Sequence, residues 1–170
     1  FDGYTYLFGP VPDVTIKNSH NKNSKIIDLG KKPLIIIYTD YEARKFAEPL
    51  GNLANKYRKN KFLAPRYRGL GIINLKDNPL LLPNWLVRSI IRSKERTFHT
   101  TFLLDEDHTL LKKWNLGYCD DRSVVMIIGK DKKIKFFKKI INQQQCYRLI
   151  PLFKKALAKE LKINDISKFN

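Results

Sequence analysis

Two thiols are the most reactive side chains in the sequence. Cys119 and Cys146 are its only cysteines, and a thiolate is both a nucleophile and a metal ligand. They lack the C-x-x-C spacing of redox motifs and the Cys/His spacing of zinc sites. In an oxidising compartment they can form one disulfide at most, and the alternative is a pair of inert thiols.

Carboxylates gather in the run Asp105-Glu106-Asp107-His108. With His99 nearby, the run has the ligand types of a hard-cation or transition-metal site. It has neither the glycine-containing loop of a calcium site nor an H-x-x-x-H pair. We therefore interpret it as a strand-to-helix turn in which Asp107 caps the helix and the other side chains are solvated. No metal and no cofactor is expected.

Positive charge is the most conspicuous property of the chain. Its 33 lysines and arginines against 16 aspartates and glutamates leave a net charge of +17, so a polyanion or an anionic surface is a partner to test. The candidate anion-binding residues are Lys56, Arg58, Lys59, Lys61, Arg66, Arg68, Arg122, Lys130, Lys132, Lys133 and Lys135.

These basic residues allow two interpretations. Tyr57, Phe62 and Tyr67 are interleaved with the first of them, as on surfaces that bind single strands or phosphates. A solvated, lysine-rich surface is the alternative, and we favour it because no nucleic-acid-binding motif is present. For Arg122 the alternative is a local ion-pair turn within Asp120-Asp121-Arg122.

Composition restricts the class of protein. The 170 residues, 43% of them hydrophobic and 12% aromatic, can bury one ordinary core, which excludes collagen, coiled coil and general disorder. The longest apolar runs, Leu34–Tyr38 and Val124–Ile128, are far shorter than the roughly 18 residues that suggest a membrane span. Sequence motifs for nucleotide binding, serine hydrolysis and zinc proteolysis are also missing.

Apolar patterns predict the elements that position these side chains. Two β-branched stretches, Val14–Ile16 and Lys25–Leu29, predict an N-terminal hairpin. The unbroken apolar run Leu34–Tyr38 predicts a central strand covered on both faces. Thr39-Asp40 is then expected to cap a helix that Pro49 kinks or delays.

The remaining pattern alternates strands with helices and then closes with a hairpin. Further strands are predicted at Gly69–Leu75, Thr101–Leu104, Val124–Ile128 and Lys133–Ile140, and further helices at Pro83–Ile91, Asp107–Trp114 and Gln143–Lys162. This order predicts an α/β fold with a mixed sheet and helices on both faces. The boundaries expected are an extended lead-in over 1–9, a single domain over 10–165 and a tail over 166–170.

Four segments resemble the YtfJ family of exported, thioredoxin-like bacterial proteins. They are GPVPDVTI at Gly9–Ile16, NLKDNPLLLPNWLVRSIIRSKE at Asn74–Glu95, FLLDEDHTLLKKWNL at Phe102–Leu116 and SVVMIIGKDKKIKFFKK at Ser123–Lys139. The resemblance implies a thioredoxin-like fold with the extra N-terminal hairpin of the peroxiredoxin branch. It also implies a periplasmic or other cell-envelope location. Because the sequence opens at Phe1 without Met, we expect that a leader has been removed, either by the cell or in cloning.

The same resemblance shows what chemistry is missing. Redox members of the thioredoxin superfamily use a thiolate in the first helical turn after the central strand, and a cis-proline before a later strand. Here Thr39–Arg44 contains no cysteine, and Asp121-Arg122-Ser123 occupies the place of the proline. Cys119 lies in the loop at the site edge and is a candidate reactive thiol, although we favour an inert role because no catalytic His, Lys or Arg pair accompanies it.

The function predicted from the sequence is therefore non-catalytic. We expect a redox-inactive thioredoxin-fold protein of the cell envelope that binds or scaffolds another envelope protein. The alternative is a basic protein that binds nucleic acid, glycosaminoglycan or anionic lipid weakly and without specificity. A thiol-redox protein that uses Cys119 is a third interpretation.

Overall fold

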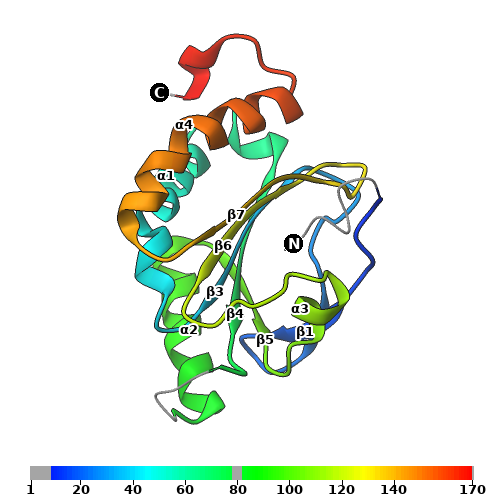
Figure 1. Ribbon diagram of the computed structural model, residues 1–170, viewed down its shortest axis with the longest axis vertical. Helices are drawn as coiled ribbons and strands as arrows, with labels where there is room; N and C mark the ends of the chain where they lie inside the picture. The colour runs from blue at the N-terminus through cyan, green and yellow to red at the C-terminus, as the bar shows by residue number, and fades with distance from the viewer. Residues whose placement is uncertain (1–8, 78–81, 170) are drawn as a thin grey trace.

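One mixed sheet of seven strands forms the centre of the computed structural model, which describes residues 9–77 and 82–169 (Figure 1). The strand order is β2-β1-β5-β4-β3-β6-β7. The strands are β1 Thr15–Asn18, β2 Asn23–Lys25, β3 Leu34–Asp40, β4 Arg68–Asn74, β5 Thr101–Asp105, β6 Ser123–Ile128 and β7 Ile134–Ile140. The predicted α/β class is confirmed.

β3 lies between two neighbours of opposite direction. It pairs in parallel with β4 and antiparallel with β6. Successive side chains of a strand point to opposite faces, so Leu34, Ile36 and Tyr38 enter one core while Ile35 enters the other. The prediction of a central strand covered on both faces is confirmed.

Helices cover both faces, as predicted. The α-helices are α1 Glu48–Arg58, α2 Asn84–Phe98, α3 Thr109–Lys113 and α4 Gln143–Glu160, and the short 3-10 helices include η2 Arg44–Ala47, η3 Ala64–Arg66 and η4 Ile166–Phe169. Figure 1 shows α1, α2 and α4 on one side of the sheet and α3 on the other. Leu50 and Phe153 belong to the core between the sheet and helices α1 and α4. Val14 and Trp114 belong to the core on the opposite face, under α3.

The N-terminal hairpin is confirmed, with a shorter second strand than predicted. β1 pairs antiparallel with β2 and with β5, so the hairpin extends the main sheet. β2 ends at Lys25 instead of Leu29, and Ile26, just after it, lies in the same core as Ile16. The chain then reverses through Asp28 and Gly30, which have φ values of 61° and 84°. Of the lead-in expected over 1–9, only Gly9 lies within the described residues.

The expected Thr39-Asp40 helix cap is wrong. Both residues belong to β3, where Asp40 pairs with Asn74 of β4, so their backbones are committed to the sheet. The chain turns through η2 and α1 begins only at Glu48, with Pro49 in its first turn. Pro49 therefore delays the helix, as predicted, because a proline is accommodated in a first turn and not in a helix interior.

The segment assigned to a C-terminal tail packs against α1. Residues Ile166–Phe169 form η4, and the Phe169 side chain is buried. Its ring meets that of Tyr57 edge to face, with centroids 5.6 Å apart. This contact holds the end of the described chain on the same core as α1 and α4.

Asp105 corrects the interpretation of the acidic run as a solvated turn. Asp105 is fully buried at the end of β5. Its carboxylate accepts from the backbone N–H groups of Leu110 and Leu111, at 3.2 and 3.1 Å, and from the Tyr38 hydroxyl, at 2.7 Å. Asp105 thus satisfies the first turn of α3, whereas Asp107 accepts only from Thr109.

Truncating Asp105 is expected to destabilise the fold. Asp105→Ala leaves two buried donors and one partly buried donor without this acceptor, so we expect the free energy of unfolding to fall by about 3 kcal/mol. Asp107→Ala, at an exposed position, should cost less than about 1 kcal/mol. Urea unfolding followed by circular dichroism measures both. Equal losses in the two variants would contradict the role assigned to Asp105.

Candidate functional site

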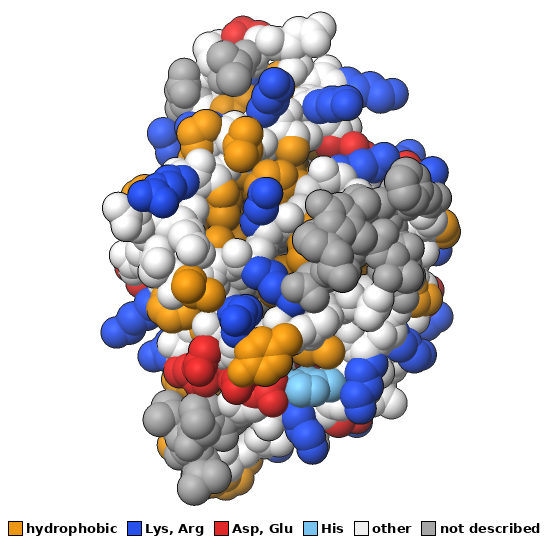
Figure 2. All heavy atoms as spheres, in the orientation of Figure 1, with side chains coloured by type: hydrophobic (Ala, Val, Ile, Leu, Met, Phe, Trp, Pro, Cys, Tyr) orange, Lys and Arg blue, Asp and Glu red, His pale blue; other side chains and the backbone are white. Residues whose placement is uncertain are grey.

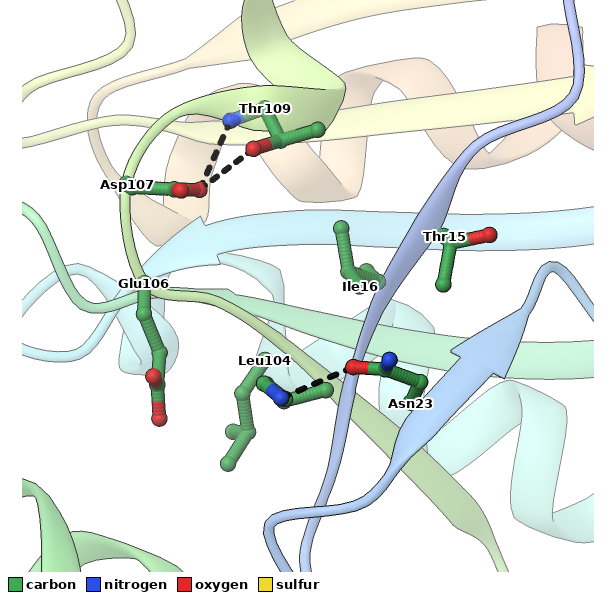
Figure 3. Close-up of a pocket in the computed structure, with 8 residues that line it drawn as sticks. Thr15, Ile16, Asn23, Leu104, Glu106, Asp107 and Thr109 are labelled. Carbon is green, nitrogen blue, oxygen red and sulfur yellow. Dashed lines mark hydrogen bonds between the residues drawn. The ribbon is translucent and has the colours of Figure 1, made fainter.

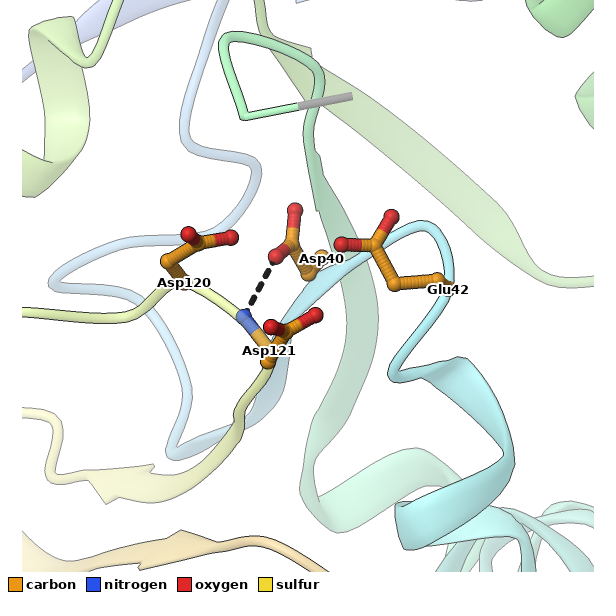
Figure 4. A group of neighbouring side chains, drawn as sticks. All are labelled: Asp40, Glu42, Asp120 and Asp121. Atoms are coloured by element: carbon orange, nitrogen blue, oxygen red, sulfur yellow. Dashed lines mark hydrogen bonds between the residues drawn. The ribbon is translucent and has the colours of Figure 1, made fainter. Parts of the chain in front are cut away.

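Four carboxylates meet where β3 ends and β6 begins. Asp40 is the last residue of β3, Glu42 lies in the turn that follows, and Asp120 and Asp121 precede β6. The antiparallel pairing of β3 with β6 brings these distant segments together. One carboxylate oxygen from each residue lies within 4.8 Å of the others, and we call these four residues the carboxylate cluster (Figure 4).

Asp40 is the innermost member of the carboxylate cluster and has 0% of its surface exposed. Its Oδ2 accepts from the backbone N–H of Asp121 at 2.6 Å, while its Oδ1 is buried and has no hydrogen-bond partner in the described part of the chain. Oε2 of Glu42 is buried and unpartnered in the same way. Figure 4 shows the carboxylates of Glu42 and Asp120 directed toward Asp40.

Buried hydroxyl groups hold the backbone beneath the carboxylate cluster. The Ser123 hydroxyl donates to the carbonyl of Ala43 at 2.7 Å and lies 2.7 Å from the Thr39 hydroxyl. These contacts join the end of β3, the turn after it and the start of β6. The carboxylates therefore project from a backbone that is tied together independently of their own interactions.

The two arginines nearest in sequence do not neutralise the carboxylate cluster. The Arg44 guanidinium lies 4.3 Å from the Tyr41 ring centroid and donates to the Tyr41 carbonyl. Arg122 lies 4.7 Å from the Tyr118 ring centroid and donates to the Asp120 carbonyl. Within residues 9–77 and 82–169, the salt bridges are Arg68–Asp28, Arg88–Glu106, His108–Asp77 and Lys135–Asp131, so none includes a cluster carboxylate.

Burial and mutual repulsion make ionisation of this group costly. Burial raises the pKa of Asp40 to about 8; the Asp121 N–H opposes this shift, while Asp120 and Glu42 add to it. Burial also raises the pKa of Glu42, with a further contribution from Asp121. A positive charge placed among these carboxylates would be attracted by the negative charges whose mutual repulsion now adds to the cost of ionisation.

The acidic run singled out in the sequence does not form one site. Glu106 pairs with Arg88 and His108 with Asp77, each at 2.8 Å, while Asp105 is buried as a cap. Sequence analysis missed the carboxylate cluster because its two halves are 81 positions apart at Asp40 and Asp121. The signal that could have found it is the thioredoxin-like order of strands, which places the end of β3 beside the start of β6.

A shallow hollow lies between β1 and the loop after β5 (Figure 3). Its polar side chains are occupied with one another: Lys17 donates to Asn23 at 2.8 Å, and Thr109 donates to Asp107. Glu106, at its rim, is the partner of Arg88. These pairings leave the hollow a weaker candidate site than the carboxylate cluster.

Both cysteines are buried thiols on opposite faces of the sheet. Cys119 is 2% exposed and belongs to the core under α3, and Cys146 is 0% exposed and belongs to the core under α4. Neither is in a disulfide, and the sheet between them accounts for this. Burial raises the pKa of the Cys146 thiol, which disfavours the reactive thiolate despite the helix start nearby.

The candidate anion-binding residues lie at the other end of the sheet, with one exception. Leu34, which begins β3, pairs with Arg68 on β4 and with Ile128 on β6. The β6–β7 turn and the C-terminal end of α1 reach this same end. The residues placed there are Lys56, Arg58, Lys59, Lys61, Arg66, Arg68, Lys130, Lys132, Lys133 and Lys135. We call this set the basic end; the exception, Arg122, lies beside the carboxylate cluster.

A family model described as "Bacterial protein of unknown function (YtfJ_HI0045)" matches residues 18–156. The chain belongs to the YtfJ_HI0045 family. This confirms the resemblance drawn from the segments between Asn74 and Lys139, whereas the segment Gly9–Ile16 lies outside the matched residues. No curated protein shows significant sequence similarity to this member of the family.

Solved thioredoxin-like structures share its fold. An uncharacterised thioredoxin-like protein from Porphyromonas gingivalis has a TM-score of 0.58 and 15% identity, over 88% of this chain and 92% of that one. A putative thioredoxin from Neisseria meningitidis has a TM-score of 0.57 and 16% identity, over 86% of this chain and 89% of that one. The exposed lipoprotein thioredoxin of Streptococcus pneumoniae has a TM-score of 0.56 and 12% identity, over 89% of this chain and 98% of that one. The predicted thioredoxin-like fold is confirmed.

Stability should fall as pH rises, because the folded state holds the Asp40 proton more tightly than the unfolded state. The stability that protonated Asp40 contributes to the folded state is complete below the ordinary aspartate pKa of about 4. It is lost as pH rises through the folded-state pKa of about 8. We expect the free energy of unfolding of Asp40→Asn to be about 2 kcal/mol higher than that of the parent at pH 8 in a chelating buffer, and the difference to be smaller at pH 5.

Urea unfolding at the two pH values measures this difference. Glu48→Gln is the matched control, because Glu48 is an exposed carboxylate on α1 outside the carboxylate cluster. It should change stability by less than about 0.5 kcal/mol at either pH. A parent protein that gains stability between pH 5 and pH 8, with no gain from Asp40→Asn, would contradict the assignment.

Proposed function

We propose that this family member is a binding protein of the cell envelope that carries out no thiol–disulfide or peroxide turnover. The observation that carries the proposal is the occupant of the site edge. Where redox thioredoxins place a thiolate after the central strand, this chain has Asp40 and Glu42. A carboxylate cannot form the mixed disulfide or sulfenic acid through which those reactions proceed.

The burial of both thiols supports the same proposal. Cys119 and Cys146 are at most 2% exposed, and thiol exchange requires a sulfur that the attacking thiolate can reach. Cys119 also donates to the Leu116 carbonyl at 3.9 Å within the core. We therefore assign both cysteines to packing.

Exposed apolar side chains around the carboxylate cluster support protein binding at this edge. Tyr118 precedes β6, Ile141 follows β7 and Tyr147 lies in the first turns of α4, and all three are more than half exposed. Figure 2 shows acidic side chains gathered beside an exposed hydrophobic one toward the bottom of the view. Aromatic side chains surrounded by polar groups are common at protein interfaces, so another envelope protein is the partner proposed.

The envelope location rests on the family resemblance and on one structural relative. The Streptococcus pneumoniae protein is described as an exposed lipoprotein thioredoxin. Among the described residues, no helix has the length and apolar character needed to cross a membrane. We propose a periplasmic or envelope-exposed location for this chain.

The purified protein is expected to show no thiol-dependent turnover. Insulin reduction with dithiothreitol and peroxide consumption with a thiol donor should match the protein-free rate, because no exposed sulfur is available. A thioredoxin with an intact C-x-x-C motif serves as the positive control. Turnover above background that disappears in Cys119→Ser would instead identify Cys119 as the catalytic thiol.

Polyanion binding at the basic end is the second candidate function. Lys32, Arg58 and Arg68 line one pocket together with Tyr67 and His99. The Arg68 guanidinium is already paired with Asp28, and Lys135 with Asp131, each at 2.8 Å. The uncompensated charge at this end therefore comes from the other lysines and arginines, and it favours weak binding to phosphate or sulfate chains.

Binding to heparin tests the basic end. We expect the affinity to fall about tenfold or more between roughly 50 and 200 mM salt, because several counterions are released. Arg66→Glu with Lys130→Glu should weaken binding, since both side chains are exposed at that end. Lys45→Glu with Lys76→Glu is the matched control for the same charge change at the opposite end. Equal losses in the two double variants would show that net charge alone determines the attraction.

A further inference from the structure

The carboxylate cluster has the composition and spacing of a cation site. We propose that Asp40, Glu42, Asp120 and Asp121 bind a hard divalent cation of the calcium class. This inference does not depend on the protein partner or on the polyanion binding proposed above. It assigns a ligand to the edge of the sheet where redox thioredoxins place their thiolate.

The unsatisfied oxygen of Asp40 is the observation that points to a ligand. Asp40 has 0% of its surface exposed, and its Oδ1 has no hydrogen-bond partner among the described residues. A buried carboxylate oxygen left unpaired is costly, so native proteins rarely keep one without a partner. Within residues 9–77 and 82–169, the N–H donor to this carboxylate is Asp121, on Oδ2, and the neighbouring Asp120 carboxyl group brings no positive charge. Oδ1 is therefore left to bind a positively charged ligand.

The charge around Asp40 identifies that ligand as a cation. The other three carboxylates approach the same point (Figure 4), although the chain as a whole carries a net charge of +17. Arg44 and Arg122 are close in sequence, but their guanidinium groups lie on Tyr41 and Tyr118. A metal ion between the carboxylates would supply the positive charge that neither arginine brings to them.

The ligand atoms select the class of cation. All four are carboxylate oxygens, which suit hard cations such as calcium and magnesium rather than copper or zinc. Their separations reach no more than 4.8 Å. Separations within this bound allow all four oxygens to reach one ion. Calcium accepts six to eight oxygens in a flexible geometry, whereas magnesium demands a near-ideal octahedron, so carboxylates supplied by separate segments suit calcium better.

The position of each carboxylate suits such a site. Asp40 is rigid in the sheet, Asp120 and Asp121 come from a single loop, and Asp121 is exposed. Calcium takes six to eight oxygens, so four carboxylates leave room for bidentate binding and for solvent on the exposed side. A site of this kind has a buried base and an open entrance.

Calcium titration of the full chain tests the proposal. After treatment with a chelator and its removal, isothermal titration with calcium chloride should give one saturable site with a dissociation constant at or below about 1 mM. Calcium should also raise the melting temperature, because it binds the folded state. Terbium should give tyrosine-sensitised emission, since the Tyr118 hydroxyl donates to Asp120 at 3.3 Å.

The variants separate this site from general charge attraction. Asp40→Asn and Asp120→Asn should each weaken calcium binding at least tenfold, while Glu48→Gln, which also removes one carboxylate, should leave it unchanged. Because Asp120 is only partly buried, Asp120→Asn provides the test even if Asp40→Asn perturbs the fold. Magnesium should bind at least tenfold more weakly than calcium.

Three results would overturn the proposal. The first is the absence of a saturable calcium signal up to about 10 mM, well above the weakest affinities of calcium modules. The second is equal calcium affinity in the parent and in both cluster variants. The third is magnesium binding tighter than calcium binding, which would remove the calcium class. None of these results bears on thiol turnover or heparin binding, so the proposals fail separately.

Discussion

The structure depends on the position of β3, which pairs in parallel with β4 and antiparallel with β6. This arrangement places the carboxyl end of β3 beside the amino end of β6. The chain that leaves β3 crosses to α1 on one face of the sheet. Ligand sites of α/β proteins form at such points because loops diverge from the sheet there. Here the same pairing brings Asp40 to the backbone N–H of Asp121 and gathers four carboxylates at one edge.

Charge is divided along the direction of the strands. The carboxylate cluster lies where β3 ends, and the basic end lies where β3 begins and β6 turns into β7. A protein with a net charge of +17 therefore has one edge of opposite sign. Over distances longer than the screening length of about 8 Å, the two ends act separately, so a cation and a polyanion would not compete for the same surface.

The edge of the sheet where β3 ends carries carboxylates instead of a thiol. Their ionisation is opposed by burial and by one another. Ser123 and Thr39 anchor the backbone below them, so the unfavourable charge is held in place by neighbouring interactions. Destabilised groups of this kind are characteristic of binding sites, where the ligand supplies the missing interaction.

The sequence by itself determined the order of elements, because an apolar run such as Leu34–Tyr38 and the stripe around Leu149 and Phe153 reflect burial locally. It determined equally that Thr39–Arg44 has no thiol. It assigned Asp40 to a helix cap and Asp105 to solvent, since local preference does not show where a ladder ends. Only the tertiary structure decided that carboxylates 81 positions apart meet and that the sheet separates the two cysteines, because strand pairing between distant segments is a property of the whole fold.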